Sequence, residues 1–333
     1  MPSARPKRSS KSDAVQHTRG SRRRNAKAQG ADYLTPALDV QSEVLTISVV
    51  VPTCRNPIAL DGCLDALVNQ NFDPAAFEII IVDNGPTLDT RAVVAKWTAR
   101  TLGRGPVVGY MPLKGSHGPV AARNAGWRVA SGDVIAFTEE NAMPDRDWLR
   151  NSLPAFQGNA QAAWGRIVTP IPETPTEHQL NAKRLEKTAF SATNCFCLKH
   201  VLETVNGFDE RFQLPGAEYA DLYFRLLRYE ARIVYLSDAI VLRPPTPAPW
   251  GASIRRQRNT FFDALLFKKH PYLYRKTIHA KPRWDHYVAF IALLTCLIGL
   301  MIDDPALAAG AGALWFSLTG RVAIHRLRHT SKA

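Results

Sequence analysis

The spacing of apolar residues alternates between two patterns over residues 45–137. Unbroken runs rich in β-branched residues, Leu45–Val51 and Phe77–Val82, predict buried strands, and the helical spacing over 58–70 predicts a helix between them. The alternation continues with a helix over 88–102, a strand over Pro106–Met111, a helix over 119–130 and a strand over Asp133–Phe137. This order predicts a doubly wound α/β sheet with a nucleotide-type crevice at the carboxyl ends of its strands.

The pattern is less regular after residue 160. It predicts strands over Ala162–Val168, Ala192–Leu198 and Arg232–Leu236, and helices over 199–205, 217–229 and 252–269. Three prolines within 170–176 predict a loop, and the prolines between Pro244 and Pro249 predict a linker.

Two apolar stretches lie near the end of the sequence. Tyr287–Ile302 holds sixteen uncharged, mostly apolar residues, and Pro305–Leu318 follows after Asp303 and Asp304. As a helix the first stretch spans roughly 24 Å, short of the roughly 30 Å hydrocarbon core, and Trp284–His286 would lengthen it at the interface. Basic residues flank both outer ends, so we expect a transmembrane hairpin with both ends in the cytoplasm. The alternative is a pair of buried soluble helices.

The net charge of +13 is unevenly distributed. Residues 1–30 hold nine Lys or Arg and one acid, residues 251–333 hold thirteen and four, and residues 31–250 hold twenty and twenty-four. Basic ends around a mildly acidic middle fit an enzyme at the cytoplasmic face of the cell membrane better than a nucleic-acid-binding fold, so no nucleic-acid partner is expected. The five cysteines form no CxxC pair, which fits a reducing compartment, and no secretory signal is expected.

These features divide the chain into four parts. We expect a disordered basic tail over 1–40, an α/β enzyme domain over 41–250, a basic amphipathic helical linker over 251–284, and the membrane hairpin with a basic tail over 285–333.

Polar side chains at two predicted turns suggest nucleotide chemistry. Asp83 directly follows a strand, where a carboxylate can accept an N–H of a nucleobase such as uracil, although an Asp-Asn-Gly turn also has backbone reasons. Gly118-Pro119 opens a helix that carries Arg123 and Asn124 one turn inside, an arrangement that favours a diphosphate. The alternative for Arg123 is a solvated side chain on an ordinary helix.

Acidic residues supply two further candidates. Glu139-Glu140-Asn141 follows the fourth strand and offers oxygen ligands that suit Mg²⁺ or Mn²⁺, the alternative being a solvated acidic turn. Glu218 and Asp221 share one helix face, where either could act as a general base or simply stabilise the helix dipole.

Five segments in order resemble the family 2 glycosyltransferases, which have the GT-A fold. They are SVVVPTCRN (48–56), EIIIVDNG (78–85), GPVAARNAGW (118–127), DVIAFTEENAMPDRDWL (133–149), and NGFDERF followed by GAEYADLYFRL (206–226). The resemblance covers about 45–243 and makes residues 41–250 a GT-A domain.

The resemblance implies a role for each matching position. Pro52, Thr53 and Asp83 would bind the donor base, Arg123, Asn124 and Glu139 would bind the rest of the donor, and Glu140 and Asn141 would bind the metal. Trp250 and Arg255–Arg258 match loosely a segment that contacts the acceptor or the donor phosphates.

Two departures from the family pattern concern the chemistry. Glu replaces the usual Asp in the metal motif, and Tyr219 stands where the family carries its base. A tyrosine, with an ordinary pKa near 10, is a poor base at neutral pH, so Glu218 is the candidate base, with Asp221 in reserve.

The sequence therefore predicts an inverting, metal-assisted glycosyltransferase. It would move a sugar from a nucleotide-sugar donor, UDP-sugar favoured, to a hydroxyl of a lipid-linked or cell-surface glycan. One alternative is a catalytically impaired, membrane-tethered binding or scaffold protein. The other is a nucleotidyltransferase, which would need a Gly-rich basic loop that residues 53–56 do not form.

Overall fold

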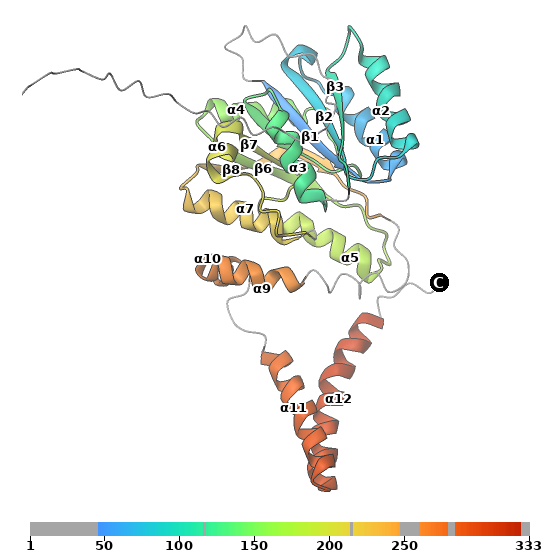
Figure 1. Ribbon diagram of the computed structural model, residues 1–333, viewed down its shortest axis with the longest axis vertical. Helices are drawn as coiled ribbons and strands as arrows, with labels where there is room; N and C mark the ends of the chain where they lie inside the picture. Colours follow the sequence, from blue (N-terminus) through green and yellow to red (C-terminus); the bar gives the residue numbers. More distant parts are fainter. Residues whose placement is uncertain (1–45, 116–117, 214–215, 247–259, 279–283, 328–333) are drawn as a thin grey trace, which may run out of the picture. The chain divides into compact units, whose positions relative to one another are not determined.

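The computed structural model describes residues 46–115, 118–213, 216–246, 260–278 and 284–327. These residues form one eight-stranded mixed sheet in the order β3-β2-β1-β4-β7-β6-β8-β5 (Figure 1). The strands are β1 (Ile47–Thr53), β2 (Phe77–Asp83), β3 (Val107–Pro112), β4 (Val134–Phe137), β5 (Met143–Pro144), β6 (Ala162–Val168), β7 (Cys195–Leu198) and β8 (Ile233–Leu242). β1 to β4 pair in parallel, which confirms the predicted α/β class.

Helices cover both faces of this sheet. They are α1 (Pro57–Val68), α2 (Leu88–Thr101), α3 (Gly118–Val129), α4 (Trp148–Gln157), α5 (Glu177–Lys183), α6 (Lys199–Val205) and α7 (Ala217–Arg228). One apolar cluster joins α1, α2 and α4 to the sheet, and a second joins α3, α6 and α7 to it. The sequence pattern does not predict α4, α5 or the two-residue β5.

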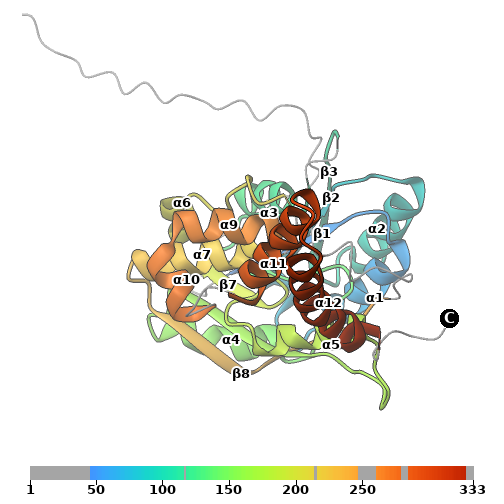
Figure 2. The same ribbon diagram turned by 90° about the horizontal axis from the view of Figure 1, so that it is seen from below.

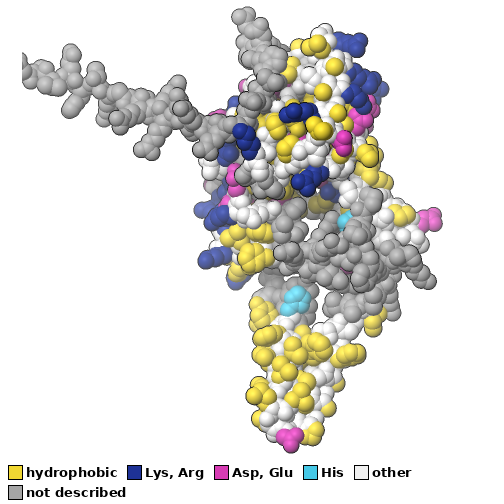
Figure 3. Space-filling model, turned by 45° about the vertical axis from the view of Figure 1, so that its right-hand side comes forward, with side chains coloured by type: hydrophobic (Ala, Val, Ile, Leu, Met, Phe, Trp, Pro, Cys, Tyr) yellow, Lys and Arg dark blue, Asp and Glu magenta, His cyan; other side chains and the backbone are white. Residues whose placement is uncertain are grey.

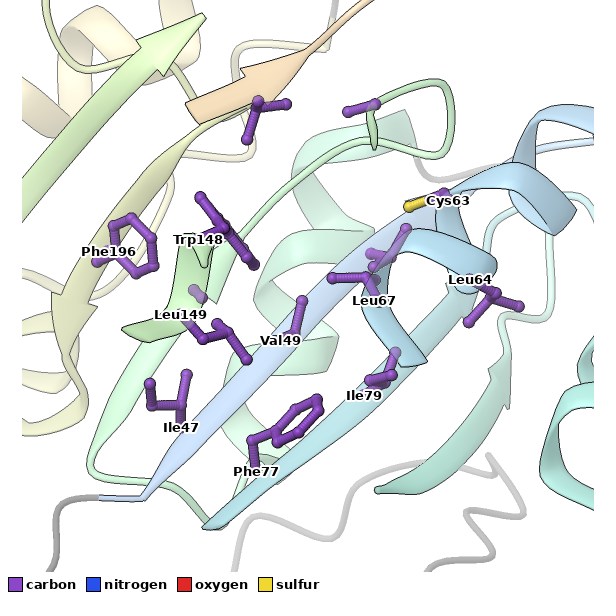
Figure 4. Packing of buried hydrophobic residues seen from close by; sticks show 14 of the residues in the cluster. Ile47, Val49, Cys63, Leu64, Leu67, Phe77, Ile79, Trp148, Leu149 and Phe196 are labelled. Atoms are coloured by element: carbon purple, nitrogen blue, oxygen red, sulfur yellow. The ribbon is translucent and has the colours of Figure 1, made fainter. Parts of the chain in front are cut away.

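The first apolar cluster shows why the central strands are fixed in register. Ile47 and Val49 of β1 pack beside Leu67 of α1 on one face (Figure 4), whereas Val50 belongs to the cluster on the other face. A slip of one residue would exchange the faces of every side chain, so burial on both sides holds the register. Gly126 lets α3 approach closely, because a Cβ there would lie 2.5 Å from Cγ1 of Val50.

Two further helices, α9 (Thr260–Lys269) and α10 (Pro271–Thr277), lie beside α7 (Figure 2). Phe262 and Leu266 of α9 pack with Phe212 and Phe224 in a third apolar cluster. The predicted helix over 252–269 is confirmed from residue 260 onward. Its earlier part, the tail over 1–40, Trp250 and Arg255–Arg258 lie outside the described residues.

The predicted C-terminal hairpin is present as two helices, α11 (Trp284–Met301) and α12 (Pro305–Leu327). They pack closely, since a Cβ on Gly299 would lie 2.7 Å from the backbone nitrogen of Ala308. None of the described helices is long and apolar enough to cross a membrane, so the transmembrane prediction is not supported. The eighteen residues of α11 extend only about 27 Å, short of a hydrocarbon core of roughly 30 Å.

Apolar side chains cover much of the outer surface of this hairpin (Figure 3). Phe290, Met301 and Phe316 are 62%, 86% and 71% exposed, respectively. The alternative prediction of two buried helices is therefore wrong.

Candidate active site

The carboxyl ends of three parallel strands bring the predicted donor-side residues together. Thr53 and Asp83 are register partners at the ends of β1 and β2, and Glu139 and Glu140 follow β4 closely. Pro52 is buried inside β1 and makes this strand end rigid. These residues therefore meet at one edge of the sheet, at the carboxyl ends of its parallel strands.

Glu140 is held by the end of β1. Its Oε2 accepts hydrogen bonds from Oγ1 of Thr53 at 2.5 Å and from the backbone N–H of Cys54 at 2.9 Å. Burial raises the pKa of Glu140, and the two hydrogen bonds act in the opposite direction. Among the residues that the structure describes this carboxylate forms no ion pair, so no basic side chain there balances its negative charge.

Glu139 instead belongs to a chain of four alternating charges. Its Oε2 accepts from Nε of Arg243 at 2.7 Å, and its Oε1 lies 3.6 Å from Nη2 of Arg123. Nη1 of Arg123 in turn lies 3.3 Å from Oε1 of Glu218. Burial opposes the ionisation of Glu139, but the two guanidinium groups outweigh it and hold its pKa below the usual range.

Glu218 begins the chain of charges at the first turn of α7. It is 1% exposed, and its second oxygen, Oε2, accepts the backbone N–H of Gly216 at 2.5 Å. Burial raises its pKa, with Arg123 acting in the opposite direction. Burial together with the carboxylates of Glu218 and Glu139 raises the pKa of the adjacent Tyr219 well above its ordinary value, so this phenol stays protonated near neutral pH.

Asp83 lies at the same sheet edge but outside this chain of charges. Its Oδ1 accepts the backbone N–H of Gly85 at 3.0 Å, and its Oδ2 accepts the hydroxyl of Tyr110 at 2.8 Å. Each carboxylate oxygen has two lone pairs, so both keep one for a further donor. The group is therefore oriented and still able to accept a nucleobase N–H.

Asn124 has a geometry that favours a structural role. Its Oδ1 accepts from Nε1 of Trp127 and the backbone N–H of Phe208, and its Nδ2 donates to the carbonyl of Phe208 and to Glu210. These four bonds use the full hydrogen-bonding capacity of the buried amide. Its donor contact stays a prediction, and the contacts present hold the turn that leads toward α7.

Asp221 points toward α9 and α10 rather than into the chain of charges. Its Oδ2 pairs with Nε of Arg225 at 2.8 Å, and its Oδ1 lies 2.6 Å from Nζ of Lys269 and 2.9 Å from Nε2 of His270. The carboxylate is fully buried. These contacts make Asp221 a tie between α7 and the α9–α10 pair, and they leave Glu218 as the better-placed candidate base.

The metal motif offers few ligands within the described residues. No group of three or more His, Cys, Asp or Glu side chains there is arranged to hold a metal ion. Glu139 faces two guanidinium groups, and within the described part of the chain the side chain of Asn141 makes no hydrogen bond. Glu140, which is half-buried and has no cationic partner among the described residues, and the amide oxygen of Asn141 fit an ion that keeps several waters and takes its other ligands from substrate phosphates.

Arg243 is a site residue that the sequence reasoning missed. The sequence pattern ends the strand before it at Leu236 and begins the proline-rich linker at Pro244, so Arg243 belongs to no predicted element. β8 in fact continues to Leu242 after a shift in its register with β6 between Gly165 and Arg166. The apolar Ile240–Leu242 was the available signal that the strand resumes after Ser237 and Asp238.

Comparison with known proteins identifies the domain. Residues 48–208 match the family model described as Glycosyl transferase family 2. These residues form a family 2 glycosyltransferase domain. Glycosyltransferase AglE of Haloferax volcanii is 22% identical over 63% of this chain and 70% of that protein. Validoxylamine A glucosyltransferase of Streptomyces hygroscopicus subsp. limoneus is 32% identical over 39% of this glycosyltransferase and only 28% of its own length.

A solved structure supports the fold of this glycosyltransferase. The mannosyltransferase PcManGT from Pyrobaculum calidifontis aligns with a TM-score of 0.55 at 18% identity, covering 88% of this chain and 90% of that protein. This similarity shows the fold, a mixed α/β sheet of the GT-A type.

Proposed function

We propose that this glycosyltransferase transfers a sugar from a nucleotide-sugar donor to an acceptor hydroxyl with inversion at the anomeric carbon. The observation that carries the proposal is the charge chain Glu218–Arg123–Glu139–Arg243, which places a buried carboxylate and two guanidinium groups at one sheet edge. The mannosyltransferase aligned above was solved with GDP-Man and Mn²⁺, and GalNAc-T7, at a TM-score of 0.50, with UDP, GalNAc and Mn²⁺.

The donor is proposed to lie across the ends of β1, β2 and β4. Asp83 and Thr53 would take the nucleobase side, and with UDP, the favoured nucleotide, Asp83 would accept the ring N–H of uracil. Arg123 would face the diphosphate from α3. Its side chain is 3% exposed and its Nε has no partner in the described structure, so this guanidinium retains a donor for an oxyanion.

Glu140 and Asn141 are proposed to hold Mg²⁺ or Mn²⁺ when the donor is bound. The ion would neutralise charge on the diphosphate of the donor. Glu139 is not a ligand in this proposal, because both of its oxygens face arginines.

Glu218 is proposed to act as the general base. Its carboxylate takes the proton of the acceptor hydroxyl while the oxygen attacks the anomeric carbon from the side opposite the diphosphate. The bond between the anomeric carbon and the donor phosphate breaks, and the nucleoside diphosphate leaves with the electron pair. Arg123 stabilises the negative charge that develops on this leaving group.

The acceptor is proposed to be a lipid-linked or cell-surface glycan at the cytoplasmic face of the membrane. Support comes from the exposed apolar side chains of α11 and α12 and from the positive charge of residues 251–333. An apolar surface with basic flanks suits attachment to an anionic bilayer surface.

Attachment predicts that the full-length protein floats with vesicles in a sucrose gradient. We expect binding to vesicles that contain an anionic lipid, weaker binding at high salt, and a marked loss in the Phe290→Ser/Phe316→Ser double variant, because each Ser removes apolar surface from the bilayer. Leu88→Ser is the control, since Leu88 is an 84% exposed apolar residue on α2. Equal flotation of both variants and wild type would contradict attachment through the hairpin.

Donor binding tests the proposed function most directly. Thermal unfolding is measured with UDP, GDP and dTDP, each with and without Mn²⁺. We expect one nucleotide to raise the melting temperature in a saturable way, more strongly with metal, because a ligand of the native state stabilises it. If no nucleotide stabilises the protein with or without metal, the catalytically impaired binding protein becomes the better conclusion.

A further inference from the structure

Arg243 lies at the edge of the proposed donor site, and its ion pair with Glu139 uses only part of its guanidinium group. Its Nε donates to Glu139, and the side chain is 17% exposed. No second ion pair or hydrogen bond of this side chain occurs in the part of the chain that the structure describes. The two terminal nitrogens, with four N–H donors, are therefore left to bind another group.

The backbone and Glu139 together fix where these donors lie. Arg243 directly follows β8, and its backbone N–H donates to the carbonyl of Val168 at 2.8 Å, which continues the pairing with β6. Glu139 then holds the guanidinium at 2.7 Å. A side chain anchored at both ends loses little freedom when it binds a ligand.

Arg123 and Arg243 flank Glu139 but differ in availability. Arg123 is 2% exposed, and its terminal nitrogens face Glu218 and Glu139 at 3.3 and 3.6 Å. Arg243 contacts one carboxylate and keeps access to solvent. A planar guanidinium with two free parallel N–H groups is the side chain best suited to grip a phosphate with two hydrogen bonds.

The sequence of contacts also indicates which phosphate it would reach. The path from the proposed base pocket runs from Thr53 to Glu140, then to Glu139 and finally to Arg243. On this path Arg243 is separated from Thr53 by the largest number of residues, so in the proposed donor pose it would face the side of the diphosphate away from the nucleobase. In a nucleoside diphosphate sugar, the phosphate on that side is the β-phosphate, which carries the sugar.

We propose that Arg243 binds the β-phosphate of the donor and that Glu139 is the positioning residue for its guanidinium. The inference rests on the proposed function and adds a residue to it. When the bond to the sugar breaks, negative charge develops on the β-phosphate, so this contact strengthens in the transition state.

The test compares ligands that differ only in their phosphates. Wild type, Arg243→Gln and Arg243→Lys are titrated by calorimetry with UDP, UMP and uridine, or with the guanosine series if the nucleotide panel selects it. We expect Arg243→Gln to weaken UDP binding by roughly 10- to 100-fold, the range for a hydrogen bond to a charged group, with a much smaller change for UMP and none for uridine. Arg243→Lys should recover part of the loss, because it restores the charge without the fork.

Arg166→Gln provides the matched control, because Arg166 is an exposed arginine on the neighbouring strand β6. An equal loss for UDP, UMP and uridine in Arg243→Gln would show a purely structural role and overturn the inference, as would unchanged UDP binding. Failure of the proposed function has a different signature: the wild-type protein itself would bind none of the nucleotides, and the inference would fall with it.

Discussion

Glu218→Gln should lower the rate of sugar transfer by about 10²- to 10⁴-fold, the usual contribution of a general base, with little change in donor binding. The carboxylate is buried at the start of α7, and its oxygens face Nη1 of Arg123 and the backbone N–H of Gly216. Gln has almost the same shape and keeps an oxygen for Gly216, but it cannot accept a proton from the acceptor. The measurement is single-turnover transfer alongside UDP titration.

Two control variants separate chemistry from charge and packing. Tyr219→Phe should retain activity near wild type, because the phenol remains protonated and has no part as a base. Glu203→Gln makes the same charge change at an exposed position of α6. The assignment is wrong if Glu218→Gln transfers sugar at the wild-type rate, or if Tyr219→Phe is the variant that loses transfer.

The same residue sets the direction of the pH dependence. The base must be ionised to work, and burial raises the pKa of Glu218 above its ordinary value of 4.5. The transfer rate of the wild-type enzyme should therefore fall as the pH drops through this raised pKa, with a midpoint above 4.5. A rate profile that stays flat down to pH 4.5 would exclude Glu218 as the titrating group.

The sequence predicts backbone positions at this site better than side-chain partners. Thr53 and Asp83 end two buried parallel strands, so hydrophobic patterning alone places them side by side. The sequence does not predict the partners of Glu139. Arg123 comes from α3, and Arg243, the residue after β8, is more than one hundred positions away from Glu139. Pattern reasoning in one sequence has no access to such pairings between distant elements.

From the sequence alone it is also hard to tell which polar side chains near a motif take part in the chemistry and which stabilise the fold. Asn124 lies beside Arg123 in the sequence, yet the two side chains face different surroundings, one a tight turn and the other the charge chain. Glu218 and Asp221 share a helix face by spacing, but only Glu218 reaches Arg123. The difference arises because α9 and α10 pack on α7 beside Asp221. Nothing in the local sequence of α7 reveals this packing.

Asp221→Asn should destabilise the protein by about 3 kcal/mol, the lower end of the cost of breaking a buried ion pair. The fully buried carboxylate contacts Arg225, Lys269 and His270, whereas a neutral amide leaves these groups without their anion. Lys269 keeps Asp209 at 2.7 Å, which limits the loss. Urea unfolding measures the free energy, and hydrogen exchange should show faster opening of α9 and α10.

The same variant tests whether Asp221 holds α9 and α10 against α7 or acts as a reserve base. At a temperature where Asp221→Asn remains folded, it should transfer sugar at close to the wild-type rate, in contrast to Glu218→Gln. Arg150→Gln is the control for stability, because it removes an exposed ion pair with Asp147, and such pairs contribute little. If Asp221→Asn were as stable as wild type, the α9–α10 pair would have to be held by the apolar contacts of Phe224, Phe262 and Leu266 alone. A stable variant that lost transfer would instead return Asp221 to the chemistry.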